Sequence, residues 1–136
     1  MRILGVDYGD VRVGLAISDP LGITAQGLHT IINKGDERLA LELSDIIRQY
    51  GVEKVVIGMP KNMKGEIGER GEKTKAFALC LQKVFDGEII FWDERLTTIS
   101  ASRVLNSTNT RKEKRKAVLD TVSAAIILEN YLNSLN

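Results

Sequence analysis

Several residue types are scarce in this chain of 136 residues, and each scarcity excludes a class of structure or chemistry. The single cysteine, Cys80, excludes an internal disulfide and lies in an apolar segment that favours a packing role. The single histidine, His29, lies in a predicted strand, and no catalytic triad can be built around it. No apolar run approaches the roughly 18 residues of a membrane span, and no signal-peptide pattern is present. The sequence therefore predicts a cytoplasmic protein with no membrane partner.

An excess of charge of one sign is also lacking. The chain has 19 basic and 18 acidic residues and a net charge of +1, which gives no overall signature of nucleic-acid binding. The basic residues are nevertheless uneven, because five of the six residues from Arg111 to Lys116 are basic. Such a run is either a solvated flank or a phosphate-binding segment, and its position shortly before Asp120 favours the second interpretation.

Length and periodicity predict one globular α/β domain over residues 1–136, with 43% hydrophobic residues to form its core. Three strands come first, at residues 2–8, 11–18 and 24–32, and the short turns between them predict an antiparallel meander. The predicted elements that follow are a helix from residue 36 to a glycine cap at 51, a strand at 54–58, a helix at about 69–84, a strand at 88–92, and helices at 98–106 and about 113–135. This order predicts a mixed five-stranded sheet, three antiparallel strands and then two parallel ones, with helices on both faces.

Asp7 ends the first predicted strand, directly after the apolar run Ile3-Leu4-Gly5-Val6. A charged side chain inside a sheet costs several kcal/mol unless it is paired or binds a metal. The turn at Gly9-Asp10 sends the chain back along the first strand, so the carboxylate is expected at the edge of the sheet, where chemistry can reach it.

Further acids stand at informative positions. Asp93 and Glu94 follow the last predicted strand, and by alternation only one of them can point to a given face. Asp120 shares a helical face with Ala124, Ile127 and Tyr131, which places its carboxylate in an apolar arc. It is therefore either a buried acid satisfied by a partner such as Arg95 or a metal ligand.

A glycine-rich segment, residues 58–71, links the fourth strand to its helix. It lacks the Lys and Ser or Thr of a Walker A loop and does not fit the Rossmann glycine pattern, so nucleotide binding of either kind has little support. It carries Lys61, Asn62, Lys64 and Arg70 at the carboxyl end of a parallel strand. Phosphate contact and a flexible surface loop are equally weighted explanations.

Four blocks together resemble a known family. They are Asp7-x-Gly9-x-x-Arg12-x-Gly14-x-Ala16-x-Ser18-Asp19, then Gly58-Met59-Pro60-Lys61-Asn62-Met63-x-Gly65, then residues 93–98 (DERLTT), and Asp120 with Ala124-Ala125 and Ile127-Leu128. In this order they are similar to the YqgF family, also called RuvX, whose members are described as Holliday junction resolvases or as nucleases that process the precursor of 16S ribosomal RNA. The resemblance implies a ribonuclease H-like fold and a metal-dependent nuclease.

The resemblance also implies roles for individual residues. Asp7, Glu94 and Asp120 would be the catalytic residues and would hold Mg²⁺ or Mn²⁺, since oxygen ligands favour these cations. Asp93 is the reserve choice for Glu94, and a site holding one metal ion instead of two stays open. Basic and polar side chains would contact the phosphates of the nucleic acid, namely Arg12, Lys61, Asn62, Lys64, Arg70, Arg95, Arg111, Lys112, Lys114, Arg115 and Lys116.

One departure from the wider fold is visible. Ribonuclease H-like nucleases commonly carry an acid at the end of the fourth strand, where this chain has Gly58-Met59-Pro60. The YqgF pattern suggests Glu94 as the substitute, and its position one strand further out makes a tight site for two metal ions harder to build. Trp92, just before these acids, is expected to pack in the core more readily than to stack on a base.

Other functions stay open on the sequence alone. A non-catalytic nucleic-acid-binding or ribosome-assembly factor could use the same fold, and Asp7→Asn would discriminate between it and a nuclease. Some phosphotransferases, namely sugar kinases and actin-like ATPases, share the Asp-x-Gly hairpin. Such enzymes close two lobes around a nucleotide, and the length of this chain provides one lobe, which argues against this function. The substrate is structured RNA or branched DNA; a resolvase would need a symmetric homodimer, whereas end trimming of RNA would not.

Overall fold

The computed structural model describes the backbone of residues 1–96 and 112–135, and the side chains of residues 1–95 and 119–135. The elements are β1 (Arg2–Asp7), β2 (Arg12–Ser18), β3 (Ala25–Ile32), α1 (Asp36–Tyr50), β4 (Val52–Met59), α2 (Gly68–Gln82), β5 (Glu88–Asp93), the 3₁₀ helix η1 (Glu94–Leu96) and α4 (Lys112–Ser134). Each predicted element within this range is present, with ends that differ by one or two residues. The helix predicted at 98–106 lies outside the described residues.

The five strands form one sheet in the order β3-β2-β1-β4-β5. Strand β2 is antiparallel to both β1 and β3, whereas β4 is parallel to both β1 and β5. Val6 is level with Ile57, and Met59 is level with Asp93. The carboxyl ends of β1, β4 and β5 therefore meet at one end of the sheet. This is the predicted meander followed by two parallel strands.

Local chemistry fixes where the first helix begins and ends. Asp36 and Glu37 lie in the first turn of α1, where negative charge complements the helix dipole. Gly51 adopts a left-handed conformation, with φ of 66°, and its N–H donates to the carbonyl of Ile47. This is the predicted glycine cap, at a backbone angle that costs glycine least.

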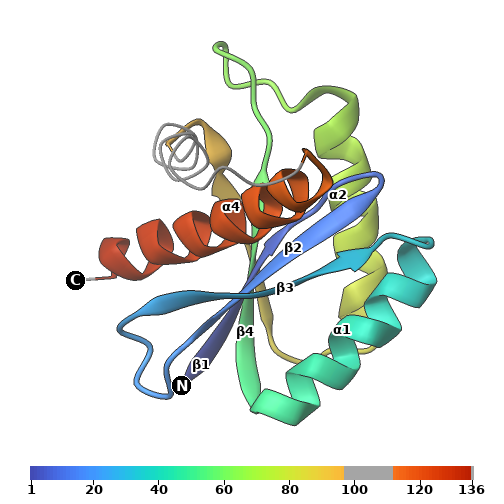
Figure 1. Cartoon of the computed structure of the whole chain (residues 1–136). Helices are drawn as coiled ribbons and strands as arrows, with labels where there is room; N and C mark the ends of the chain where they lie inside the picture. The colour runs from blue at the N-terminus through green and yellow to red at the C-terminus, as the bar shows by residue number, and fades with distance from the viewer. Residues whose placement is uncertain (97–111, 136) are drawn as a thin grey trace.

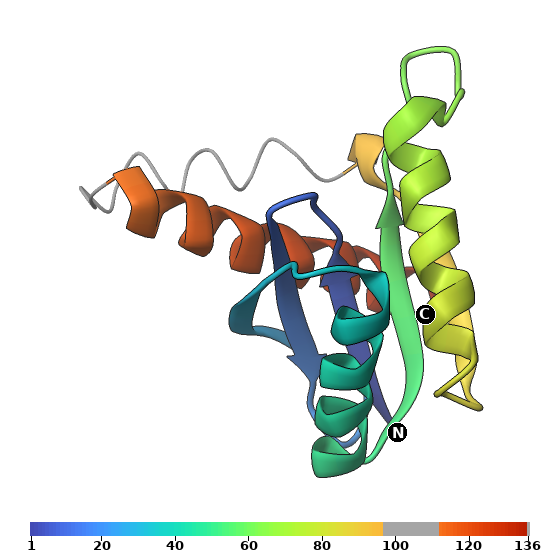
Figure 2. The same ribbon diagram turned by 90° about the vertical axis from the view of Figure 1, so that its right-hand side faces the viewer.

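Helices cover the sheet on both faces, as predicted. Figure 2 shows α4 on one side of the sheet and α1 and α2 on the other. In Figure 1, α4 crosses in front of the strands. No helix in the described part of the chain is long and apolar enough to cross a membrane.

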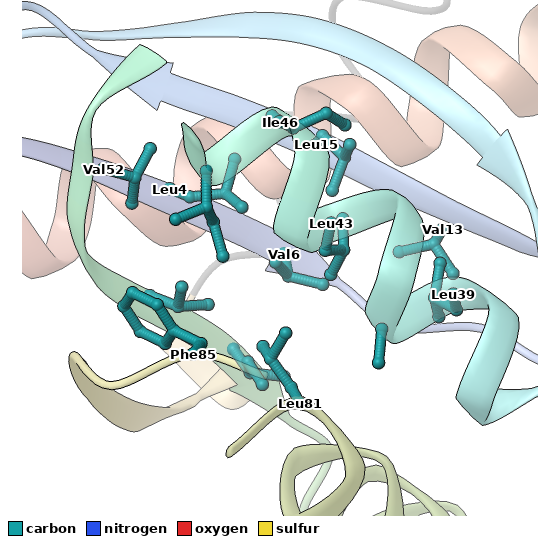
Figure 3. Close-up of a cluster of buried hydrophobic side chains, with 14 of the residues drawn as sticks. Leu4, Val6, Val13, Leu15, Leu39, Leu43, Ile46, Val52, Leu81 and Phe85 are labelled. Atoms are coloured by element: carbon teal, nitrogen blue, oxygen red, sulfur yellow. The ribbon is translucent and has the colours of Figure 1, made fainter. Parts of the chain in front are cut away.

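Two apolar clusters hold these layers together. The larger one lies between the sheet and helices α1 and α2. Figure 3 labels ten of its members: Leu4, Val6, Val13, Leu15, Leu39, Leu43, Ile46, Val52, Leu81 and Phe85. The smaller cluster joins the sheet to α4 through Ile3, Ala16, Val56, Ala124, Ile127, Leu128, Tyr131 and Leu132. Buried apolar area of this kind is the main stabilising contribution to such a fold.

Glycines on the sheet bring the backbone of α4 unusually close. A Cβ atom at Gly14 would lie 2.0 Å from the carbonyl oxygen of Asp120, and one at Gly27 would lie 2.4 Å from Cγ2 of Thr121. Gly5 is less crowded, because its Cβ would lie 2.9 Å from Cβ of Leu128. The sheet therefore fixes the height of Asp120 above β2 through direct backbone contact.

The Gly14→Ala variant is expected to be less stable by about 2 kcal/mol, because the added methyl group meets helix backbone that cannot move aside alone. Gly5→Ala is the matched control, since it adds the same atom beneath the same helix with a milder overlap, and a smaller loss is expected. Urea denaturation of both variants measures the difference. Wild-type stability in Gly14→Ala would contradict the close approach of α4 at this position.

Candidate active site

Three acids that are far apart in the sequence converge at the carboxyl end of the parallel strands. Asp7 is the last residue of β1, Glu94 is the first residue of η1 directly after β5, and Asp120 lies on α4. The side chains of Asp7 and Glu94 are hydrogen-bonded, and the charge of Asp120 acts on Asp7. The structure thus places the three acids that the sequence selected at one end of the sheet.

Gly58 explains how Glu94 reaches this position. It lies next to the end of β1, on β4, and is level with Trp92 of β5. A Cβ atom at Gly58 would lie only 2.4 Å from Oε1 of Glu94 and 2.6 Å from Cδ1 of Ile127. The Glu94 carboxylate therefore fills the space that a side chain on the fourth strand would take. The longer reach from η1 is possible because β4 offers no side chain there.

The environment of Asp7 strongly favours its neutral form. Burial is the largest of several causes, with the charge and hydrogen bond of Glu94 and the charge of Asp120, that together raise the pKa of its carboxyl group from 3.8 to about 8. The positive charge of Arg70 opposes this shift. At neutral pH and without a cation, Asp7 therefore keeps a proton, which reduces the repulsion within the acidic cluster.

This shift predicts how stability depends on pH. The folded pKa of Asp7 lies above its ordinary value of 3.8, so the unfolded chain releases this proton first as the pH rises. The free energy of unfolding is therefore expected to fall between about pH 4 and pH 8, by at most about 1.4 kcal/mol per pH unit, and then to level off. Urea denaturation in EDTA at pH 5, 6, 7 and 8 measures this slope. Asp7→Asn should flatten it, and an equal slope in both proteins would contradict the assignment.

Asp120 has a basic partner that sequence reasoning did not select. Nε of Arg12 donates to Oδ2 of Asp120 at 2.9 Å. The structural partner considered from the sequence was Arg95, and this was wrong, because Arg95 is engaged by another acid. The signal was available in the strand alternation: Arg12 and Gly14 lie on the same face of β2, and Gly14 faces Asp120.

Asp93 and Glu94 point to different surroundings, as the alternation predicted. Nε of Arg95 donates to both carboxylate oxygens of Asp93, at 3.0 and 2.9 Å, and the hydrogen bonds from Arg95 lower the pKa of Asp93. Glu94 instead faces Asp7. Asp93 is therefore the structural member of the pair in this arrangement, and its partner Arg95 was one of the predicted phosphate contacts.

The loop between β4 and α2 lies beside the acids. Its turn is built on Asn62, whose Oδ1 accepts the backbone N–H groups of Lys64 and Glu66 at 2.9 and 3.0 Å. The charge of Lys61 acts on Asp93, and that of Arg70, at the start of α2, acts on Asp7. Lys64 is exposed. The remaining predicted contacts, Arg111, Lys112, Lys114, Arg115 and Lys116, lie outside the residues whose side chains the structure describes.

Trp92 packs against α4, as expected from its position. Its ring meets Tyr131 edge-on, with 6.0 Å between the ring centroids. Its buried Nε1 has no hydrogen-bond partner among the described residues. His29 is exposed on β3, far along the chain from the acids, and Cys80 is partly buried against the larger apolar cluster.

The acids suit a hard divalent cation in their chemistry. The charge and hydrogen bonding of Glu94 raise the pKa of Asp7, so the two carboxyl groups lie near each other, and a cation can take the place of the proton that Asp7 keeps. Within the described side chains, no group of three acidic, histidine or cysteine residues is placed to hold one ion. The third acid, Asp120, is turned to Arg12 instead.

Comparison with known proteins extends over the whole chain. The family model described as "RuvX: Holliday junction resolvase" matches residues 1–134. Relatives named "Putative pre-16S rRNA nuclease" include one from Halothermothrix orenii, 51% identical over 100% of this chain and 97% of its own length. The one from Acetivibrio thermocellus is 50% identical over 98% of this chain and 96% of its own length. The Bacillus subtilis relative is 45% identical over the full length of both chains.

Solved structures with little sequence identity share the fold. RuvC of Thermus thermophilus in complex with a Holliday junction superposes with a TM-score of 0.60 and 13% identity, covering 99% of this chain and 95% of that chain. The fowlpox virus Holliday junction resolvase has a TM-score of 0.62 and 16% identity, covering 100% of both chains. The predicted ribonuclease H-like fold is thereby confirmed. Because the family model and the relatives cover almost the whole chain, the chain belongs to the RuvX family.

Proposed function

We propose that this protein is a divalent-cation-dependent nuclease that hydrolyses phosphodiester bonds, and that it acts in processing the 5′ end of the 16S ribosomal RNA precursor. The observation that carries the proposal is the contact between Asp7 and Glu94, close to Asp120, at the end of the parallel strands. Buried carboxyl groups without a compensating charge are costly, and a cation site is the common reason for such an arrangement.

The residues of the chain have distinct tasks in this proposal. When bound, Mg²⁺ or Mn²⁺ supplies positive charge at the scissile phosphate and activates the attacking water. Asp7 and Glu94 would hold the cation in their ionised forms, and Asp120 would be the third ligand, from α4. No side chain has to act as a nucleophile. The basic residues of the loop between β4 and α2, together with Arg70 at the start of α2, hold the flanking phosphates of the strand.

RNA is favoured over branched DNA as the substrate by the closer relatives. Proteins 45–51% identical to this chain carry a name that refers to the 16S ribosomal RNA precursor. Holliday junctions appear in the description of the family model and in the titles of solved structures, and those structures are only 13–16% identical and support the fold alone. Phosphate contacts fix position without reading bases, so the choice has to be tested directly.

The test offers the purified protein two substrates, a precursor RNA that contains the 5′ end of 16S RNA and a four-way DNA junction, with Mg²⁺ or Mn²⁺. Cleavage of the RNA near the mature end, abolished by EDTA, is expected. The mass of the protein in solution is measured alongside, because paired incisions of a junction need a symmetric dimer. Cleavage of the junction alone, by a dimer, would overturn the proposed substrate.

A second candidate is a ribosome-assembly or nucleic-acid-binding factor that does not cleave. It is favoured by one observation, namely that Arg12 already neutralises Asp120, so that the described acids do not form a group of three ligands. Tight RNA binding with no cation-dependent cleavage, unchanged in Asp7→Asn, would support this candidate and exclude the nuclease.

A further inference from the structure

Arg12 lies within hydrogen-bond distance of Asp120 and can compete for its carboxylate. Its Nε lies 2.9 Å from Oδ2 of Asp120, and the two side chains are only 28% and 23% exposed. An ion pair shielded from water to this extent keeps more of its strength than an open surface pair. The carboxylate of Asp120 is therefore paired with Arg12.

The backbone of α4 leaves Asp120 little freedom to contact Arg12 and the other two acids at the same time. The helix rests on Gly14 at its Asp120 carbonyl, and Oγ1 of Thr121 is hydrogen-bonded to Oγ1 of Thr30 at 2.9 Å. With the helix fixed in this way, only rotation of the Asp120 side chain can change its partner. That rotation has to break the contact with Arg12 before the carboxylate can turn to Asp7 and Glu94.

The guanidinium group of Arg12 also suits a different partner. Its planar set of donors matches the oxygens of a phosphate, which it can bind in a bidentate manner. Arg12 begins β2, directly after the turn that follows Asp7, so it stands at the same end of the sheet as the three acids. A strand that places its backbone over these acids brings a phosphate toward Arg12.

We propose that Arg12 is a positioning residue that holds Asp120 outside the cation site until a phosphate of the bound strand takes over the guanidinium group. This inference rests on the proposed function, because it assigns to Asp120 a ligand role in the same site. It also requires cation binding and strand binding to strengthen each other, since each favours the state in which Arg12 and Asp120 are apart.

The test measures Mn²⁺ binding by titration calorimetry in the absence of nucleic acid, so that it needs no catalytic activity. Arg12→Gln removes the competing cation and is expected to bind Mn²⁺ about fivefold more tightly than the wild type, the size of a partly shielded ion pair. Arg38→Gln is the matched control, because it removes the same charge from the surface pair of Arg38 and Glu42 on α1, and unchanged Mn²⁺ binding is expected. Arg12→Lys, which keeps the charge and is the safer variant for folding, should show a smaller gain.

A double variant separates competition for Asp120 from a general effect of charge. If Arg12 acts through Asp120, Arg12→Gln should not tighten Mn²⁺ binding when Asp120→Asn is also present. In EDTA, Arg12→Gln should also bind a short structured RNA less tightly than the wild type, because it lacks the phosphate contact. An equal gain in the presence and absence of Asp120 would overturn the inference.

Failure of the inference and failure of the proposed function give different results. If the wild type binds Mn²⁺ through Asp7 and cleaves RNA, but Arg12→Gln binds Mn²⁺ no more tightly, the inference is overturned and the proposed function stands. If Asp7→Asn takes up Mn²⁺ as well as the wild type does, the cation site itself is refuted, and both are overturned together.

Discussion

The Asp7→Asn variant is expected to lose cation-dependent cleavage by a factor of about 10³. Substitutions of residues that only support a metal ligand cost 10- to 100-fold, so loss of a direct ligand should cost more. Asparagine has nearly the shape of aspartate but cannot become an anion, so it spares the packing at the end of β1. The measurement compares initial rates of RNA cleavage in Mn²⁺, with Mn²⁺ uptake followed by calorimetry.

Asp93→Asn is the matched control for this prediction. It makes the same chemical change next to the cluster, on an acid whose two oxygens are bound by Arg95. Its cleavage rate is expected to stay within a fewfold of the wild type. Equal losses in Asp7→Asn and Asp93→Asn would mean that Asp93 and not Glu94 supplies the second carboxylate.

Folding of both variants is checked by urea denaturation. Asp7→Asn should be at least as stable as the wild type at pH 8, because burial penalises the charged form of Asp7.

The Gly58→Ala variant is expected to cleave about a hundredfold more slowly, although it changes none of the acids. Its methyl group would overlap Oε1 and Cγ of Glu94, at 2.4 and 2.9 Å, and so push this carboxylate away from Asp7. A displacement of about 1 Å within a catalytic group can cost roughly two orders of magnitude in rate. Because the atoms that must move are ends of side chains, the loss of stability should be modest.

A double variant decides whether this loss passes through Glu94. Glu94→Gln alone should be severely impaired, and adding Gly58→Ala to it should cause little further loss, because residues that act together are not additive. Two independent losses that multiply would show instead that Gly58→Ala disturbs the helix through Ile127, whose Cδ1 lies 2.6 Å from the added atom. Cleavage rates of the four proteins in Mn²⁺ complete the comparison.

Much of this architecture could be predicted because local signals agree with the fold. The short turns between the first three strands specify the meander, and Gly51 marks the end of α1 through a backbone angle that other residues avoid. The apolar arc of α4 also reveals its inward face, with Ala124 and Ile127 fully buried and Asp120 among them. An acid in an apolar arc is unfavourable unless a partner or a cation compensates its charge, so the sequence alone selects this residue.

The parts that could not be predicted depend on contacts between distant segments. Nothing near Gly58 in the sequence indicates that its missing side chain makes room for Glu94, because that requires the register of β4 and β5. The partner of Asp120 likewise follows only from the height of α4 above β2, which the glycines of the sheet determine. Strand alternation puts Arg12 on the same face as Gly14, but only the tertiary packing assigns its partner.

The great sequence distance within the acidic cluster has a consequence for biosynthesis. Arg12 and Asp120 are separated by 108 residues, and joining such remote positions carries a large entropic cost that is met only once the intervening layers are packed. A nascent polypeptide that has not yet emerged as far as α4 therefore lacks a complete hydrolytic centre. On the proposed function, a nuclease made by ribosomes would thus be inert beside ribosomal RNA until α4 has been synthesised and packed on the sheet.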